Sequence, residues 1–293
     1  MGRPIVIQPN RFWTVANDGY RTDSSLQTIY TGENTPAGAS TRNATFIPAE
    51  SGPDRPGGTL FLDIHAASPL ANKLLAALPH ADSSSLFAHF TIVPMAQGTV
   101  LINVDDEVDQ VFFPLNGMIS LLVLLKNGTA IETACVGREG VVGAMAGLGL
   151  HRSRVRAVVQ LAGAFARIPA PQFRKATANS AAISNLCIRY NEALLTEARV
   201  TAACNLSHSV EARFCRWLLQ SRDHAESDTV PLTQEFLSQM LGVRRTSVTE
   251  VAIKMQDAGV ISYSRGIIKI VDLQKLKDVS CECYETLRDE TPE

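Results

Sequence analysis

The sequence has little that points to a membrane or to secretion. Its longest strongly apolar stretches, residues 118–125 and 141–150, are far shorter than the roughly 20 residues that a membrane-spanning helix needs. The N-terminus has no continuous apolar region and no small-residue cleavage pattern, so a secretory signal is not expected. We therefore predict a protein without a membrane partner that works in the cytoplasm.

Cysteine is also scarce, and its spacing matches no common site. Six cysteines in 293 residues are too few for a disulfide framework, and no CxxC pair suggests a zinc or iron–sulfur site. We expect reduced, mostly buried thiols and no metal. Cys281 and Cys283 form a Cys-Glu-Cys sequence near the C-terminus, for which a redox role is the alternative.

An excess of one charge is lacking as well. The 27 Lys and Arg nearly balance the 29 Asp and Glu, which excludes a protein coated with positive potential but not a local nucleic-acid-binding element. With 45% hydrophobic and 19% charged residues, the chain does not have the composition of whole-chain disorder. Its length suits about two folded domains.

Residues 1–66 differ from the rest of the chain. Segment 30–58 is rich in Thr, Gly, Pro, Ser and Asn and shows neither strand nor helix periodicity, so we expect a flexible leader over 1–66. The sequence leaves open whether the leader carries function or results from an upstream start codon. Ser68 and Pro69, followed by an apolar stripe, predict a short helix before Pro79. A second short helix is expected from Ser83 or Ser84 to about His89.

Strand signals follow over residues 90–173. Asn-Gly pairs at 116–117 and 127–128 predict hairpins, and the strand-like runs are 111–113, 118–125, 130–136, 155–161 and 164–168. Several short strands at this spacing predict an antiparallel barrel or jelly roll within 67–173. The run 118–125 is almost unbroken in its apolar character, so we expect it to be buried on both faces.

The chain then has no proline or glycine from residue 172 to residue 224. A three- and four-residue periodicity predicts a long helix, with a break near 207–209. The stripe consists of Ile183, Leu186, Tyr190, Leu194, Glu197, Thr201 and Cys204. We predict that it forms a parallel dimer seam within 174–208. The alternative, which Glu197 favours, is that the helix packs back on its own domain.

Residues 231–272 are the most informative segment. Thr233 can cap a helix over 234–241, Gly242 permits a tight turn, and a second helix is predicted over 245–258. Two helices joined by a short turn with glycine indicate a helix-turn-helix within 209–293. Residues 260–263 and 267–271 then predict a two-stranded wing with Arg265 at its tip.

The second helix opens with side chains of the types that contact phosphates and base edges in the major groove. We predict double-stranded DNA as a partner. The expected contacts are Thr233, Arg244, Arg245, Thr246, Ser247, Thr249, Glu250 and Arg265. The alternative is a small helical domain whose arginines are merely solvated.

Five short segments mark a known order of parts: VGREGVVG at 136–143, AACN at 202–205, LTQEFL at 232–237, LGVRR at 241–245 and CECY at 281–284. From about residue 68 onward the chain resembles the cyclic-AMP receptor/FNR (Crp/Fnr) family of bacterial transcription regulators. The resemblance implies an α+β fold, with a cyclic-nucleotide-binding-like jelly-roll β-barrel, a long dimerisation helix and a C-terminal winged helix-turn-helix. It also implies a homodimer that reads a palindromic operator, RNA polymerase as a further partner, and no enzymatic activity.

The family's cyclic-nucleotide site pairs a glycine with a glutamate that holds the ribose, and adds an Arg-Ser or Arg-Thr that holds the phosphate. Here Ala144 follows Gly143, whereas Arg152-Ser153 supplies the phosphate half. The resemblance therefore does not extend to cyclic AMP as effector. The glycine-rich turn at 137–143 and Arg152 still suit an anion. The candidate effector-binding residues are therefore Gly140, Gly143, Arg152 and Ser153.

No cofactor is predicted. Oxygen-sensing members of the family carry cysteines ahead of the barrel, and this chain has none before Cys135. Haem would need an axial ligand, but His89, His151 and His208 are scattered along the sequence. Two other functions stay open: a ligand-binding module that does not bind DNA, and a cupin-like jelly-roll enzyme. The enzyme would need a cluster of histidines and carboxylates that the barrel segment lacks.

Overall fold

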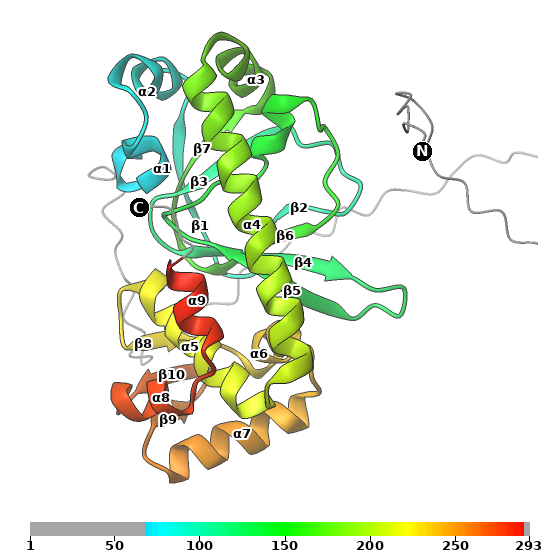
Figure 1. The fold of residues 1–293 in the computed structure, drawn as a ribbon, viewed down its shortest axis with the longest axis vertical. Coiled ribbons are helices and arrows are strands. Elements are labelled where there is room, and N and C mark those ends of the chain that lie inside the picture. Colours follow the sequence, from blue (N-terminus) through cyan, green and yellow to red (C-terminus); the bar gives the residue numbers. More distant parts are fainter. Residues whose placement is uncertain (1–67, 290–293) are drawn as a thin grey trace, which may run out of the picture. The chain divides into compact units, whose positions relative to one another are not determined.

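The computed structural model describes residues 68–289, so the leader predicted over 1–66 lies outside the described residues (Figure 1). The first elements are η2 (Pro69–Ala71), α1 (Lys73–Ala76) and α2 (His80–Phe87). The helix predicted before Pro79 is divided in two because Asn72 starts a new cap. The Ser68 hydroxyl accepts the Leu70 N–H at 3.2 Å, and the Asn72 side chain accepts the Leu75 N–H at 3.1 Å.

Seven strands form a roll of two antiparallel sheets. They are β1 (Thr91–Met95), β2 (Val100–Ile102), β3 (Gln110–Pro114), β4 (Met118–Leu124), β5 (Ala130–Val136), β6 (Arg156–Leu161) and β7 (Gly163–Pro169). One sheet has the order β1-β7-β3 and the other β2-β6-β4-β5. Their facing side chains, such as Phe113 and Phe165 against Ile119 and Val159, share one core. Because each sheet keeps its own edges, the predicted barrel is corrected to an open roll.

Strands β3 to β7 confirm the five predicted runs to within one or two residues. Strands β1 and β2 were not predicted, since Pro94 interrupts the pattern of the first and the second has only three residues. Residues 118–122 of strand β4 are buried on both faces, but Val123 and Leu125 are 36% and 44% exposed, so the burial predicted for 118–125 holds only for its first part. Ile119 faces the core of the roll, whereas Met118 packs with Phe214 and Trp217 in a second core.

Three helices follow the roll: α3 (Ala170–Asn179), α4 (Ala181–Ser207) and α5 (Val210–Ala225). The predicted break near 207–209 is confirmed, because the Ser209 hydroxyl caps α5 by accepting the Ala212 N–H at 3.2 Å. A further break at Ser180 was not predicted. There the backbone is extended, and the Ser180 hydroxyl accepts the Ile183 N–H at 3.2 Å. No helix within residues 68–289 is both long and apolar enough to cross a membrane.

The C-terminal part packs around the second core. Its elements are β8 (Thr229–Pro231), α6 (Gln234–Leu241), α7 (Arg245–Asp257), β9 (Ile261–Ser264), β10 (Ile267–Ile270), α8 (Leu273–Val279) and α9 (Cys283–Asp289). The two predicted helices and the two strands of the wing are confirmed. Strand β8 adds a third member to the wing sheet, in the order β8-β10-β9.

Candidate functional site

Helices α6 and α7 meet at a three-residue turn and form a helix-turn-helix (Figure 1). The Thr233 hydroxyl caps α6 by accepting the Phe236 N–H at 3.3 Å. Gly242 ends α6 with a φ of 61°, a left-handed conformation that favours glycine. Leu237 of α6 and Val248 of α7 are both fully buried in the second core, which fixes the angle between the helices.

The first turn of α7 is the exposed part of this motif. Arg244 occupies the N-cap position without a side-chain cap, so the first N–H groups of the helix can receive an anion. The exposed predicted DNA contacts are Thr233, Arg244, Arg245, Thr246, Glu250 and Arg265, and the half-buried ones are Ser247 and Thr249. The predicted residues therefore lie on an accessible edge of the molecule.

The wing turn lies beside the start of α6. Arg265 and Gly266 both have positive φ, 50° and 77°, as in the tight hairpin turns that match strand twist. The Leu232 N–H donates to the Gly266 carbonyl at 2.7 Å, and the Tyr263 hydroxyl donates to the Leu232 carbonyl at 3.3 Å. These bonds bring the exposed Arg265 next to Thr233, so these two predicted DNA contacts are neighbours.

A cavity of about 270 Å³ lies between the roll and α4. Most of its lining is aliphatic, and α4 contributes Tyr190 and Leu194. Of the four predicted effector-binding residues, Gly143, Arg152 and Ser153 line this cavity. Gly140 does not; its carbonyl accepts the Asn72 side-chain amide at 2.9 Å instead.

The polar groups of the cavity lie at one edge. Arg152 donates to the Asp105 carbonyl at 2.9 Å, and Arg154 pairs with the Asp105 carboxylate at 2.8 Å. Ala144 is buried and offers no acceptor for a ribose hydroxyl, and no described residue of the lining is Asp or Glu. The cavity therefore suits an apolar ligand with an anionic group better than it suits a ribose.

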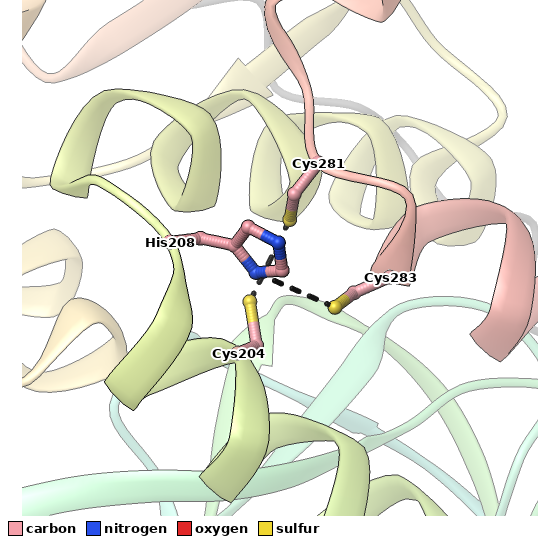
Figure 2. A group of neighbouring side chains, drawn as sticks. All are labelled: Cys204, His208, Cys281 and Cys283. Carbon is pink, nitrogen blue, oxygen red and sulfur yellow. Dashed lines mark hydrogen bonds between the residues drawn. The ribbon is translucent and has the colours of Figure 1, made fainter.

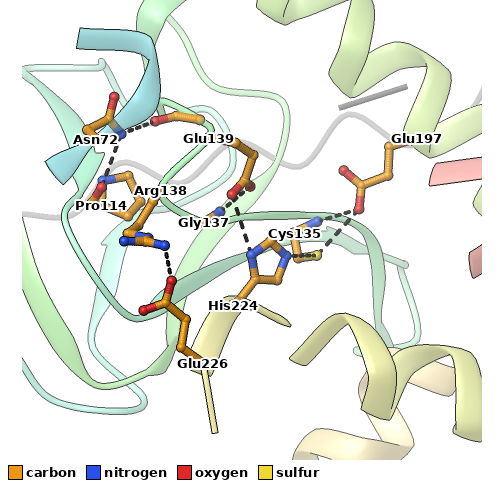
Figure 3. A network of polar contacts seen from close by, with 10 residues as sticks. Asn72, Pro114, Cys135, Gly137, Arg138, Glu139, Glu197, His224 and Glu226 are labelled. Carbon is orange, nitrogen blue, oxygen red and sulfur yellow. Dashed lines mark hydrogen bonds and ion pairs between the residues drawn. The ribbon is translucent and has the colours of Figure 1, made fainter. Parts of the chain in front are cut away.

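The glycine-rich turn after β5 joins the roll to α5 (Figure 3). Glu139 accepts the Gly137 N–H at 2.7 Å and lies 3.5 Å from Nδ1 of His224, with both side chains only 16% exposed. Arg138 pairs with Glu226 at the surface. A Cβ on Gly137 would overlap the His224 ring, so this close approach requires glycine. Gly137, Arg138 and Glu139 thus form part of a domain junction, which their sequence did not reveal.

Charges in this junction depend on one another. Burial raises the pKa of Glu139, but the charge and hydrogen bond of His224 outweigh it and hold that pKa at about 2. Burial lowers the pKa of His224, but the Glu139 charge outweighs it and raises that pKa overall. On α4, burial raises the pKa of Glu197 to about 7, although this carboxylate accepts the Cys135 N–H at 3.0 Å. Elements β5, α4 and α5 thus meet in one buried ionisable cluster.

The helix-turn-helix part also contacts the outer face of the β4 sheet. Trp217 of α5 donates its indole N–H to Glu132 of β5 at 3.0 Å. Gln160 of β6 lies 3.0 Å from the Met240 sulfur of α6. A Cβ on Gly242 would lie 3.6 Å from the Ile131 side chain. The turn of the motif is therefore in contact with the β4–β5 hairpin.

The stripe predicted as a dimer seam faces the chain's own roll. Tyr190 is buried in the roll core and Leu194 packs against it, so the prediction that this stripe forms the seam is wrong and the packing-back alternative holds for this face. A different side of α4 also carries apolar residues, and these are exposed. Ile188, Leu195 and Leu206 are 55%, 41% and 91% exposed.

All six cysteines are free and buried, as predicted. The structure nevertheless brings Cys281 and Cys283 next to Cys204 and His208, with ligand atoms within 4.8 Å of one another (Figure 2). His208, which is remote from Cys281 and Cys283 in the sequence, therefore lies beside them in the fold. Motif spacing missed the cluster because its two halves are 77 residues apart.

Two family models match the chain. One describes the Crp-like helix-turn-helix domain and matches residues 212–279, and the other describes the cyclic nucleotide-binding domain and matches residues 92–180. A search of curated proteins found no match. Together, the two domains and the long helix between them define a DNA-binding transcription regulator. The chain belongs to the Crp/Fnr family of such regulators.

Solved structures with this fold include a Crp/Fnr-family regulator from Eubacterium rectale, which is 18% identical, with a TM-score of 0.58 over 73% of this chain and 98% of that one. FixK2 from Bradyrhizobium japonicum is 14% identical, with a TM-score of 0.56 over 66% and 98%. The c-di-GMP responsive regulator CLP from Xanthomonas campestris is 14% identical, with a TM-score of 0.55 over 66% and 100%. At these identities the likeness concerns the fold.

Proposed function

We propose that the protein is a homodimeric regulator that reads a palindromic operator with α7 in the major groove and responds to an effector in the cavity beside α4. The observation that carries this proposal is the exposed, uncapped first turn of α7. A helix N-terminus with adjacent arginines suits both a phosphate and a base edge. RNA polymerase is included as a partner, because a regulator on DNA changes transcription through the polymerase.

The second face of α4 supports the dimer. Ile188, Leu195 and Ala202 are exposed and seven residues apart, and Leu206 lies one turn further on. On a helix these positions fall within an arc of roughly 40°. Apolar residues seven apart supply one of the two apolar positions in each heptad of a two-stranded parallel seam. Glu192 and Arg199, which pair at 3.1 Å on the same side, would flank that seam.

The predicted DNA contacts have two roles in this proposal. Arg245, Thr246 and Glu250 are exposed along α7 and would face base edges, as their positions in the family resemblance imply. Thr233 and Arg265 flank them at the start of α6 and at the wing tip, where phosphates would lie. Arg245 also lies 4.0 Å from Glu235 in a weak ion pair, and on DNA its guanidinium would contact a guanine in place of this carboxylate.

The proposed effector is a small apolar molecule with one anionic group. Aliphatic side chains line most of the cavity, and Arg152, Arg154 and Ser153 supply the polar edge. Because Tyr190 and Leu194 of α4 also line it, a ligand there would contact the proposed dimerisation helix directly. A ligand changes the equilibrium only if it binds one arrangement of the subunits better than the other.

Selection of bound sequences from a random DNA pool by the purified full-length protein tests this function. We expect an inverted repeat whose half-sites are about one helical turn apart, roughly 34 Å. Enrichment of a single unrepeated site, or no enrichment, would contradict the proposal. A non-binding result would favour the ligand-binding module.

Two variants sharpen the selection. Arg245→Ala should still enrich an inverted repeat, but with one base position relaxed in each half-site. Lys277→Ala removes an equally exposed cation from α8, outside the helix-turn-helix, and serves as the matched control. Loss of preference at the same base position in both variants would show that general charge, rather than base reading, determines the selected sequence.

A further inference from the structure

Four potential metal ligands meet at the hinge between α4 and α5 (Figure 2). Cys204 and His208 are four residues apart, so they lie on one side at the C-terminal end of α4. Cys281 and Cys283 precede and begin α9, and their side chains point toward the same space. All three cysteines are buried, and His208 is half-buried. Val200 and Ala212 pack against the three thiols.

The distances suit a single tetrahedral ion. The sulfurs of Cys204 and Cys281 are 3.6 Å apart, and the Cys283 sulfur lies 3.7 Å from Nδ1 of His208. A tetrahedron with zinc–sulfur bonds of about 2.3 Å has ligand–ligand edges of roughly 3.8 Å. An iron–sulfur cluster places several irons and sulfides between its cysteines and needs them further apart.

The imidazole of His208 is held as a metal ligand requires. Its Nε2 lies 3.1 Å from the carboxylate of Glu282, while Nδ1 faces Cys283. An Nε2–H that donates to a carboxylate leaves the lone pair of Nδ1 directed at the cysteines. Carboxylate–histidine–metal arrangements of this kind orient the ring and strengthen the ligand. Glu282 lies between the two cysteines in sequence, so one short segment supplies both ligands and the orienting carboxylate.

A buried cation offsets the charge that such a site would carry. Three thiolates and one Zn²⁺ have a net charge of −1, and Arg216 of α5 is only 5% exposed and interacts electrostatically with all three cysteines. Among the described residues, Nε of Arg216 has no hydrogen-bond partner. A buried guanidinium beside a negatively charged centre is more favourable than one among neutral thiols.

We propose that Cys204, His208, Cys281 and Cys283 bind one Zn²⁺ in a closed Cys₃His structural site. Four protein ligands leave no open position for chemistry. Each thiol releases its proton to solvent as its sulfur binds the metal. The ion joins the end of α4 to α9, and α9 is tied to α5 through the Tyr284 hydroxyl, which donates to Asp223 at 2.8 Å. The site thus fixes the hinge between the proposed dimerisation helix and the DNA-binding part.

Metal analysis of the full-length protein, purified under reducing conditions, tests this assignment. We expect about one zinc per chain in the wild type, as for a structural site. Cys281→Ser should lose it. Cys215→Ser, which changes an equally buried cysteine of α5 outside the cluster, should keep it. A folded wild type without zinc, a protein with iron and sulfide, or a Cys281→Ser variant that retains zinc would each overturn the assignment.

Two milder variants decide the question if Cys281→Ser does not fold. Glu282→Gln should weaken zinc affinity by roughly 10- to 100-fold, as expected for loss of the orienting carboxylate. Glu285→Gln, which changes an exposed glutamate in the first turn of α9, should not change it. His208→Cys should keep the metal, and Co²⁺ in place of zinc should then show a spectrum changed from that of the wild type. Equal zinc affinity in the two glutamate variants, or an unchanged Co²⁺ spectrum, would refute the site.

Discussion

The ion pair of Glu139 and His224 makes the most quantitative prediction. Glu139→Gln keeps the size of the side chain and an oxygen that can accept the Gly137 N–H, but it removes the charge opposite His224. A fall in the pKa of Glu139 from 4.5 to about 2, at about 1.36 kcal/mol for each pH unit, corresponds to about 3 kcal/mol. The side chains are mostly buried, so solvent screening reduces this value only in part. We therefore expect a loss of 2 to 3 kcal/mol in the free energy of unfolding, as an order of magnitude.

This loss should depend on pH in a defined direction. The pKa of Glu139 is lowered in the folded chain, so its contribution is complete above about 4.5 and is lost as the pH falls toward 2. The pKa of His224 is raised, so its contribution is complete below about 6.5 and is lost as the pH rises through the folded-state value. The difference between wild type and Glu139→Gln should therefore be largest between these two limits and should shrink in more alkaline buffer. The other ionisable groups that interact with this pair include Glu197, Glu132, Cys135, Asp223 and Tyr190.

Urea unfolding followed by far-ultraviolet circular dichroism, over a series of pH values, provides the assay. Glu226→Gln is the matched control, because it removes a carboxylate from the exposed Arg138 pair of the same junction and should change stability by less than about 1 kcal/mol. A double-mutant cycle of Glu139→Gln with His224→Gln isolates the coupling. A Glu139→Gln variant as stable as Glu226→Gln, or a difference from wild type that does not change with pH, would refute the reasoning.

Three further predictions concern the dimer, the DNA contacts and the cavity. Leu195→Glu should give monomers in a sedimentation experiment at micromolar concentration, and dimers that persist would place the seam elsewhere. Leu194→Glu should chiefly lower the melting temperature, because Leu194 packs on the chain's own roll. Arg245→Ala should reduce the free energy of binding to the selected operator by roughly 1 to 3 kcal/mol and should change binding to random DNA little. Arg265→Ala should weaken binding to both DNAs alike and reduce the slope of log affinity against log salt concentration by about 1. Equal losses on both DNAs for Arg245→Ala would contradict its role in base recognition. Millimolar cyclic AMP should change neither the melting temperature nor the affinity for the operator. A shift of several degrees in the melting temperature that Arg152→Ala abolishes would indicate instead that the cavity binds a cyclic nucleotide.

Local signals account for what the sequence predicts well. The cap at Thr233 and the glycine at 242 act within a few residues of the helices they delimit, so α6 and α7 could be placed almost to the residue. The strands that flank hairpin turns could be predicted equally well from the sequence. Strand β1 was missed because it contains Pro94 and is only partly buried, so it lacks the apolar run that identified β4.

Contacts between distant segments account for what was missed. Glu139 and His224 are 85 residues apart, and nothing near either one indicates that they form a pair. The stripe on α4 was read correctly as apolar, but periodicity shows only that a face is buried, not whether the chain's own roll or a second chain covers it. Cys204 and Cys281 likewise approach each other only once α9 has folded against the end of α4.

The stoichiometry of the protein on its selected operator tests the central claim most directly. Sedimentation equilibrium of the full-length protein with the palindromic duplex should give two chains for each duplex. In a parallel mobility-shift titration, a duplex with only one half-site should bind far more weakly, because the second recognition helix then has no specific base contacts. One chain for each duplex, or equal affinity for the palindrome and the half-site, would contradict a dimer that reads both halves of an operator.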